Sequence, residues 1–111
     1  MESLDDWDND KISRMNAKYD QFYKETLGSP KYFMAPMVGA SELPFRMMGR
    51  KYGCDLCYTP MVSAKSIVRS FEENGNLNDR LRFHKLDRPL IIQLCANDTA
   101  LIVRAVQIIE S

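Results

Sequence analysis

The sequence lacks the features that mark several classes of protein. No apolar run approaches the roughly 18 to 20 residues that span a membrane, so we expect no membrane partner. The 15 acidic and 15 basic side chains leave a formal net charge of zero. Nucleic-acid binders usually carry a basic excess, because phosphate contacts supply most of their affinity. Composition therefore argues neither for nor against an RNA partner.

The amino terminus also lacks the basic stretch and the following apolar stretch of a secretory signal. Residues 1–10 are polar and acidic, and we expect them to be disordered. The 3 cysteines are an odd number without a disulfide framework, as in proteins of a reducing compartment. These observations predict a cytoplasmic or nuclear location.

Cys54 and Cys57 invite a zinc or redox interpretation because they are separated by two residues. A zinc site needs four ligands, and only Cys95 and His84 remain to complete one. Positions three apart in a strand point to opposite faces. We interpret the thiols as structural, expect no metal site, and expect His84 to be solvated.

Two regions follow each other along the chain. Residues 1–30 form an extension, in which apolar side chains recur at helical spacing over Lys11–Leu27 and Gly28-Ser29-Pro30 ends the helix. Residues 31–111 alternate between strand and helix patterns, which predicts an α/β fold with parallel strands. The expected strands are 32–35, 55–59 and 89–94. The expected helices are 42–52, capped by Ser41, 63–71, and 99–110, capped by Asp98.

The expected helices also have predicted inward faces. Ile67, Val68 and Phe71 would point inward from the second helix of this region. The last helix would bury a larger apolar set, consisting of Leu101, Ile102, Ala105, Val106 and Ile109.

Three blocks resemble the tRNA-dihydrouridine synthase family, in its order and at about its spacing. They are Tyr32–Arg46, which contains Ala35-Pro36-Met37, then Tyr52–Met61 and Arg88–Asp98. Their residues are most similar to those of the eukaryotic branch of the family, which acts near the start of the D-loop. The resemblance implies that residues 31–111 are a partial FMN-binding domain, the first three β/α units of a truncated TIM (β/α)8 barrel.

The resemblance also implies an activity. Family members use FMN, reduced by NADPH or NADH, to convert a uridine C5=C6 bond in tRNA to dihydrouridine. The positions that match the family's flavin contacts are Pro36, Met37, Val38 and Gln93, with Asn97 as a weaker neighbour. At the end of a barrel strand, backbone groups around Pro36 can meet the ring edge, and the Gln93 amide can both donate and accept.

Other readings of these residues stay open. Ala35-Pro36-Met37 could be only a strand terminus, and Gln93 could be a buried amide satisfied within the core. Asn97-Asp98 is most simply a helix cap, and Arg46 could be either a surface charge or a group near the active face. The basic and acidic side chains of 65–88 alternate, which favours a solvated face over an RNA-binding patch.

The family's proton-donating cysteine belongs to an Asn-x-Gly-Cys-Pro motif, and none of the three cysteines matches it. The family's phosphate-binding lysine and histidine and its tRNA-binding domain have no counterpart in these residues either. We therefore expect no catalytic residue here and an inactive, truncated chain. The alternatives are another flavin-barrel reductase, acting on a small molecule, and a non-catalytic interaction or structural module.

Overall fold

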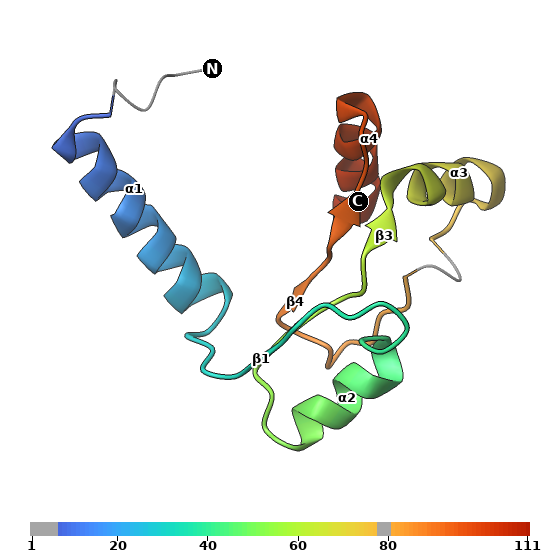
Figure 1. Cartoon of the computed structure of the whole chain (residues 1–111), viewed down its shortest axis with the longest axis horizontal. Helices are drawn as coiled ribbons and strands as arrows, with labels where there is room; N and C mark the ends of the chain where they lie inside the picture. The colour runs from blue at the N-terminus through green and yellow to red at the C-terminus, as the bar shows by residue number, and fades with distance from the viewer. Residues whose placement is uncertain (1–6, 78–80) are drawn as a thin grey trace. The chain divides into compact units, whose positions relative to one another are not determined.

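The computed structural model describes residues 7–77 and 81–111 (Figure 1). The chain divides into two compact units, Met1–Pro30 and Lys31–Ser111. Each unit is described by itself.

The first unit is helical. It consists of α1 (Asn9–Gln21) followed directly by one π-helical turn, η2 (Phe22–Thr26). The Asp8 carboxylate accepts a hydrogen bond from the backbone N–H of Lys11 and caps α1. The prediction of disorder over residues 1–10 is therefore wrong for Asp8–Asp10, and residues 1–6 lie outside the described ranges. Gly28 ends the helical region with a φ of 75°, as its sequence position predicts.

The second unit is an α/β arrangement with parallel strands, as the alternating pattern predicts. In chain order it contains β1 (Phe33–Met34), α2 (Leu43–Lys51), β2 (Leu56–Tyr58), β3 (Val62–Ser63), α3 (Ala64–Asn74), β4 (Leu90–Ile91), β5 (Leu94–Cys95) and α4 (Thr99–Glu110). Parallel pairing joins β1 to β2 and β2 to β4 in one sheet, and β3 to β5 in a second. The predicted strand 89–94 is thus divided between β4 and β5, and β3 is a short strand that was not predicted.

The division changes the pairing register by one residue. Tyr58 pairs with Ile91 at the end of the first sheet, and Val62 pairs with Leu94 at the start of the second. Three residues, 59–61, therefore lie opposite two, 92–93. This is the residue count of a β-bulge, which bends a strand and re-aims its side chains.

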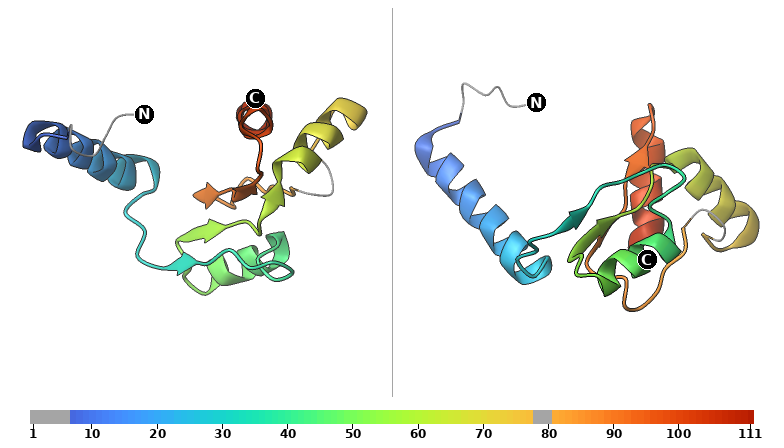
Figure 2. Two further views of the ribbon diagram at one scale, coloured as in Figure 1. Left: turned by 45° about the horizontal axis from the view of Figure 1, so that its top comes forward. Right: turned by 60° about the horizontal axis from the view of Figure 1, so that its bottom comes forward.

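Helices α3 and α4 pack side by side on the second sheet (Figure 2). Ile67 and Val68 of α3 are buried, and Phe71 packs against them, as predicted. On α4 the buried side chains are Ala105 and Ile108. The prediction that Ile102 and Val106 point inward is wrong, because α4 turns its Ala105–Ile108 face to α3 and leaves those two exposed. Among the helices of the described residues, none combines the length and apolar character needed to cross a membrane.

Candidate functional site

The carboxyl ends of β1, β2 and β4 lie at one edge of their sheet, because the three strands are parallel and paired in the order β1-β2-β4. The residues that follow these strands are 35–38, 59–61 and 92–93. In parallel α/β proteins, ligands bind at the carboxyl ends of the strands. The four predicted flavin contacts all fall at this edge.

The turn after β1 carries three of the four predicted contacts. Ser41 organises it, since its hydroxyl accepts from the Met37 N–H at 2.8 Å and donates to the Met37 carbonyl at 3.1 Å. Gly39 completes the turn with a φ of 73°. Val38 at the tip is 77% exposed, and in the part of the chain that is described its backbone N–H has no hydrogen-bond partner.

Two expectations for this turn change as a result. Ser41 was predicted to cap α2, but its hydroxyl is used within the turn, and Glu42 occupies the cap position without a side-chain bond. The Met37 N–H and carbonyl are both occupied by Ser41 and Ala40. The Val38 N–H is therefore the better donor for a ligand.

Gln93, the fourth predicted contact, lies in the two-residue break between β4 and β5. Its side chain is exposed, so the alternative of a buried amide satisfied within the core is wrong. Its backbone is fixed on both sides, because the N–H donates to the Thr59 hydroxyl at 3.1 Å and the carbonyl accepts from Val62 at 2.9 Å. Since β2 lies between β1 and β4, the turn and Gln93 are about two strand spacings, or roughly 10 Å, apart.

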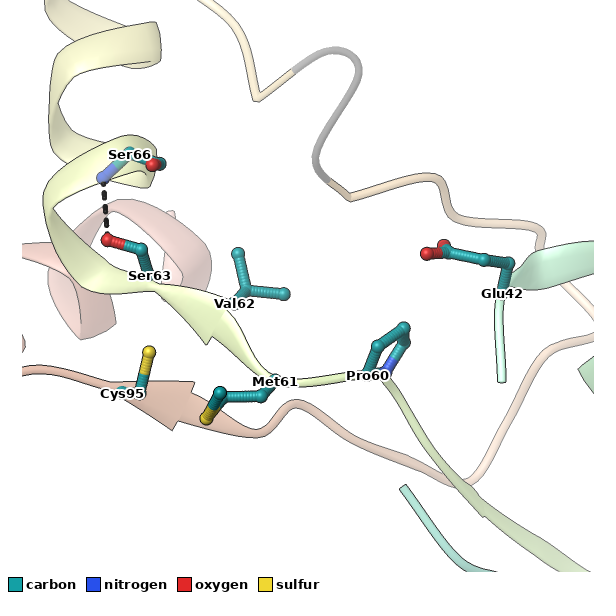
Figure 3. A pocket seen from close by; sticks show the side chains of 7 residues that line it. All are labelled: Glu42, Pro60, Met61, Val62, Ser63, Ser66 and Cys95. Atoms are coloured by element: carbon teal, nitrogen blue, oxygen red, sulfur yellow. Dashed lines mark hydrogen bonds between the residues drawn. The ribbon is translucent and has the colours of Figure 1, made fainter. Parts of the chain in front are cut away.

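A pocket of about 350 Å³ adjoins this edge, which is within the range of small-molecule sites. Figure 3 shows the Glu42 carboxylate on one side and Cys95 on the other, with Pro60 and Met61 between them. Val62, Ser63 and Ser66 complete the lining. Ser63 caps α3 by accepting from the Ser66 N–H at 3.3 Å. None of the four predicted flavin contacts lines this pocket.

Asn97 and Asp98 have different roles. The Asp98 carboxylate accepts from the backbone N–H groups of Ala100 and Leu101 and caps α4, as predicted. Asn97 is exposed beside it. His84 is also exposed, as predicted, and its Nδ1 accepts from the Leu86 N–H.

A buried ionic cluster is the feature that the sequence did not reveal. Asp87 is 1% exposed and accepts from Arg46 at 2.9 Å and from Arg50 at 2.8 Å. Arg46, itself 2% exposed, also donates to the carbonyls of Ser41 and Arg82. The interpretation of Arg46 as a surface charge is therefore wrong, and so is that of Asp87 as part of a solvated face.

Cys54 and Cys57 also differ from expectation. Their Sγ atoms lie 3.7 Å apart, and not on opposite faces, because Cys54 precedes β2 and is free of its alternation. Burial, followed by the hydrogen bond with Cys54, raises the pKa of the Cys57 thiol to about 11. Within residues 7–77 and 81–111, no three His, Cys, Asp or Glu side chains gather as metal ligands would.

Comparison with known proteins gives these features a context. The sequence model of the dihydrouridine synthase family matches residues 33–111. The chain belongs to the dihydrouridine synthase family. Apart from Tyr32, the matched region includes all three sequence blocks and every residue of the strand edge.

Curated dihydrouridine synthases are similar over the same region. A mouse protein named tRNA-dihydrouridine(16/17) synthase [NAD(P)(+)]-like is 41% identical over 88 residues, covering 77% of this chain and 18% of the relative. The Saccharomyces cerevisiae tRNA-dihydrouridine(16/17) synthase [NAD(P)(+)] is 38% identical, covering 78% and 20%. A human tRNA-dihydrouridine(20a/20b) synthase [NAD(P)+]-like is 44% identical, covering 68% and 23%. The chain thus spans about a fifth of the length of these relatives. No solved structure matches it.

Proposed function

We propose that this chain forms the part of a tRNA-dihydrouridine synthase that meets the ring edge of FMN, within the first three β/α units of a barrel. One observation carries the proposal. In a chain of this family, two exposed groups lie without partners in the described structure, the Val38 N–H and the Gln93 amide, at the carboxyl edge of three parallel strands.

These groups suit a flat ring with alternating donors and acceptors. The Val38 N–H can only donate, whereas the Gln93 amide can donate and accept. Their separation of roughly two strand spacings allows both to meet one extended ring. Pro36 restricts the backbone before the turn, and Ser41 holds Met37 in place. The restricted backbone at Pro36 and the hydrogen bonds of Ser41 both pre-organise the edge for ligand binding.

A bound flavin would supply the two-electron chemistry for reducing a uridine C5=C6 bond, with NADPH or NADH as the source of electrons. The residues of this chain would bind the ring and orient it. The substrate would be a uridine in tRNA, as the names of the relatives state for those proteins.

FMN titration tests the binding role. We expect purified chain to bind FMN and the Gln93→Ala variant to bind it roughly 3- to 30-fold more weakly, because one or two hydrogen bonds are lost. Gln107→Ala is the matched control, since Gln107 is an exposed amide on α4. Quenching of FMN fluorescence measures both. A chain that does not bind FMN, or a Gln93→Ala variant that binds as well as the control, would contradict the proposal.

A chimera tests the substrate. Residues 33–111 would replace the matching segment of the yeast (16/17) synthase in a strain that lacks this enzyme. We expect dihydrouridine to reappear in tRNA, as measured by mass spectrometry of nucleosides. A chimera that accumulates to normal levels, binds FMN and makes no dihydrouridine would show that the segment does not support this reaction.

We also propose that these 111 residues alone turn over no uridine. The reaction needs a proton donor, and Cys57 is fully buried while Cys54 lies at the amino end of β2, away from the ligand edge. Cys95 lines the pocket, but it lacks the Asn-x-Gly-Cys-Pro surroundings of the family's donor. Dihydrouridine formation by the isolated chain, supplied with FMN and NADPH, would contradict this.

A further inference from the structure

The break between the two small sheets has an unusual hydrogen-bond pattern. In a regular parallel ladder, a residue's N–H bonds backward to one carbonyl of the neighbouring strand, and its own carbonyl accepts from an N–H further along. Thr59 follows the first half of this rule, because its N–H donates to the Ile91 carbonyl at 2.9 Å.

The second half of the rule is broken. The Gln93 N–H would be expected on the Thr59 carbonyl, but it donates instead to the Thr59 hydroxyl at 3.1 Å. That hydroxyl in turn donates to the Pro60 carbonyl at 2.9 Å. The side chain of Thr59 thus takes the place of its own backbone carbonyl. The ladder resumes at Val62, whose N–H donates to the Gln93 carbonyl.

This substitution fixes the orientation of Gln93. Thr59 is 1% exposed, so its hydroxyl has no competing bulk water. Ile92 and Leu94, on either side of Gln93, both pack against the core cluster. Extended backbone alternates its side chains, and Gln93 is accordingly exposed. Two hydrogen bonds hold the backbone of Gln93 in one orientation, one from its N–H to the Thr59 hydroxyl and one from the Val62 N–H to its carbonyl.

We propose that Thr59 is a positioning residue. Its hydroxyl bridges the three-against-two break, in which residues 59–61 lie opposite residues 92–93, and it holds Gln93 where its amide can reach a ligand. This inference rests on the proposed role of Gln93 in FMN binding. Thr59 would touch neither flavin nor uridine, and it acts through the backbone of Gln93.

Amide hydrogen exchange tests the geometry without any ligand. Thr59→Val keeps the shape of the side chain and removes the hydroxyl, whereas Thr59→Ser keeps the hydroxyl. We expect exchange of the Gln93 N–H to become roughly 3- to 10-fold faster in Thr59→Val, as loss of one hydrogen bond predicts, and to stay near the wild-type rate in Thr59→Ser. Unchanged exchange in Thr59→Val would overturn the proposal.

FMN affinity tests the consequence. Thr59→Val should weaken FMN binding roughly 3- to 10-fold, and Thr59→Ser should restore most of it. The double variant Thr59→Val/Gln93→Ala should bind no more weakly than Gln93→Ala alone, since Thr59 affects FMN only through the position of the Gln93 amide. Ile108→Ala, in the core between α3 and α4, is the control for general destabilisation and should leave FMN affinity unchanged.

Failure of the proposed function and failure of the positioning role of Thr59 give different results. Wild-type chain that does not bind FMN contradicts the proposed function, while the exchange experiment still decides the role of Thr59 in the backbone. If Gln93→Ala weakens FMN binding but Thr59→Val does not, FMN contact stands and the positioning role falls. Additive effects in the double variant would likewise overturn it, because Thr59 would then act independently of Gln93.

Discussion

At the scale of single residues, Cys57 shows how burial controls a thiol. Its side chain is fully buried in β2, beside the partly exposed Cys54. Desolvation disfavours the thiolate, which raises the pKa of Cys57 from its usual 9.0 to about 11. Thiolate is the reactive form, so Cys57 should react slowly with alkylating agents.

This pKa predicts how stability depends on pH. The folded chain holds the Cys57 proton more tightly than the unfolded chain, so the free energy of unfolding should fall as pH rises from about 9 to about 11. Urea unfolding over this range measures the effect. Tyrosines and lysines titrate nearby, so Cys57→Ala is the reference. In this variant the free energy of unfolding should fall less steeply with pH. An equally steep fall in both proteins would refute the raised pKa of Cys57.

Helix caps show what local sequence can and cannot predict. Asp98 was predicted as the cap of α4 and is one, because only neighbouring N–H groups compete for its carboxylate. Ser41 was predicted as the cap of α2, yet Glu42 occupies the cap position and the Ser41 hydroxyl bonds to Met37. The competing partner comes from the conformation of the turn after β1, which cap preference alone does not contain.

At the scale of elements, the ionic cluster fastens α2 to the segment that leads into β4. Arg50 donates to Asp87 and to the carbonyls of Asp55, Arg88 and Pro89. Arg46 joins the same carboxylate and also reaches Ser41, which organises the candidate site. Arg46 and Asp87 are 41 positions apart in the sequence, so no local sequence pattern predicts their contact. Two arginines one turn apart on a largely apolar helix were the available signal.

Removing the shared carboxylate should be costly. We expect Asp87→Asn to lower the free energy of unfolding by about 3–5 kcal/mol, because it leaves the buried Arg46 guanidinium without its counter-charge. Urea unfolding measures the change. The control is Glu73→Gln, which breaks the exposed Arg69–Glu73 pair of α3 and should cost less than about 1 kcal/mol. Similar losses in both variants would show that burial does not matter here.

The predictions placed β1, β2 and β4 correctly and in order, but they missed β3 and the division between β4 and β5. Apolar runs mark 55–59 and 89–94 as strands whatever their internal pairing. The break depends on the Thr59 hydroxyl replacing a carbonyl, an interaction between segments that hydrophobic periodicity cannot express. Three of the four proposed flavin contacts lie in a turn, Pro36–Val38, and family resemblance placed them there, not periodicity.

At the scale of the whole molecule, burial is concentrated in residues 31–111. Neither α1 nor η2 has a buried residue, whereas the hydrophobic core cluster comes from β3, α3, α4 and Leu81. Parallel α/β architecture in this second unit follows from the alternation of apolar runs and helical faces. Its membership of a barrel remains part of the proposed function.

Deletion of residues 1–30 should therefore change the second unit little. We expect its free energy of unfolding to shift by less than about 1 kcal/mol, since no core side chain is removed, and its FMN affinity to stay the same. Urea unfolding and FMN titration of residues 31–111 measure both quantities. A large loss of either would assign a structural or binding role to the extension.

The three-against-two break has a consequence for engineering and for tolerance of deletions. Removing one residue from 59–61 would let the two small sheets merge into one regular ladder, and we expect the protein to gain stability because a bulge disrupts the ladder. The pairing of Val62 with Leu94 would be kept, but the Gln93 N–H would then bond to a backbone carbonyl, as in a regular ladder, and would lose its anchor at the Thr59 hydroxyl. The irregular edge is therefore a place where a more stable sheet and a well-presented amide exclude each other.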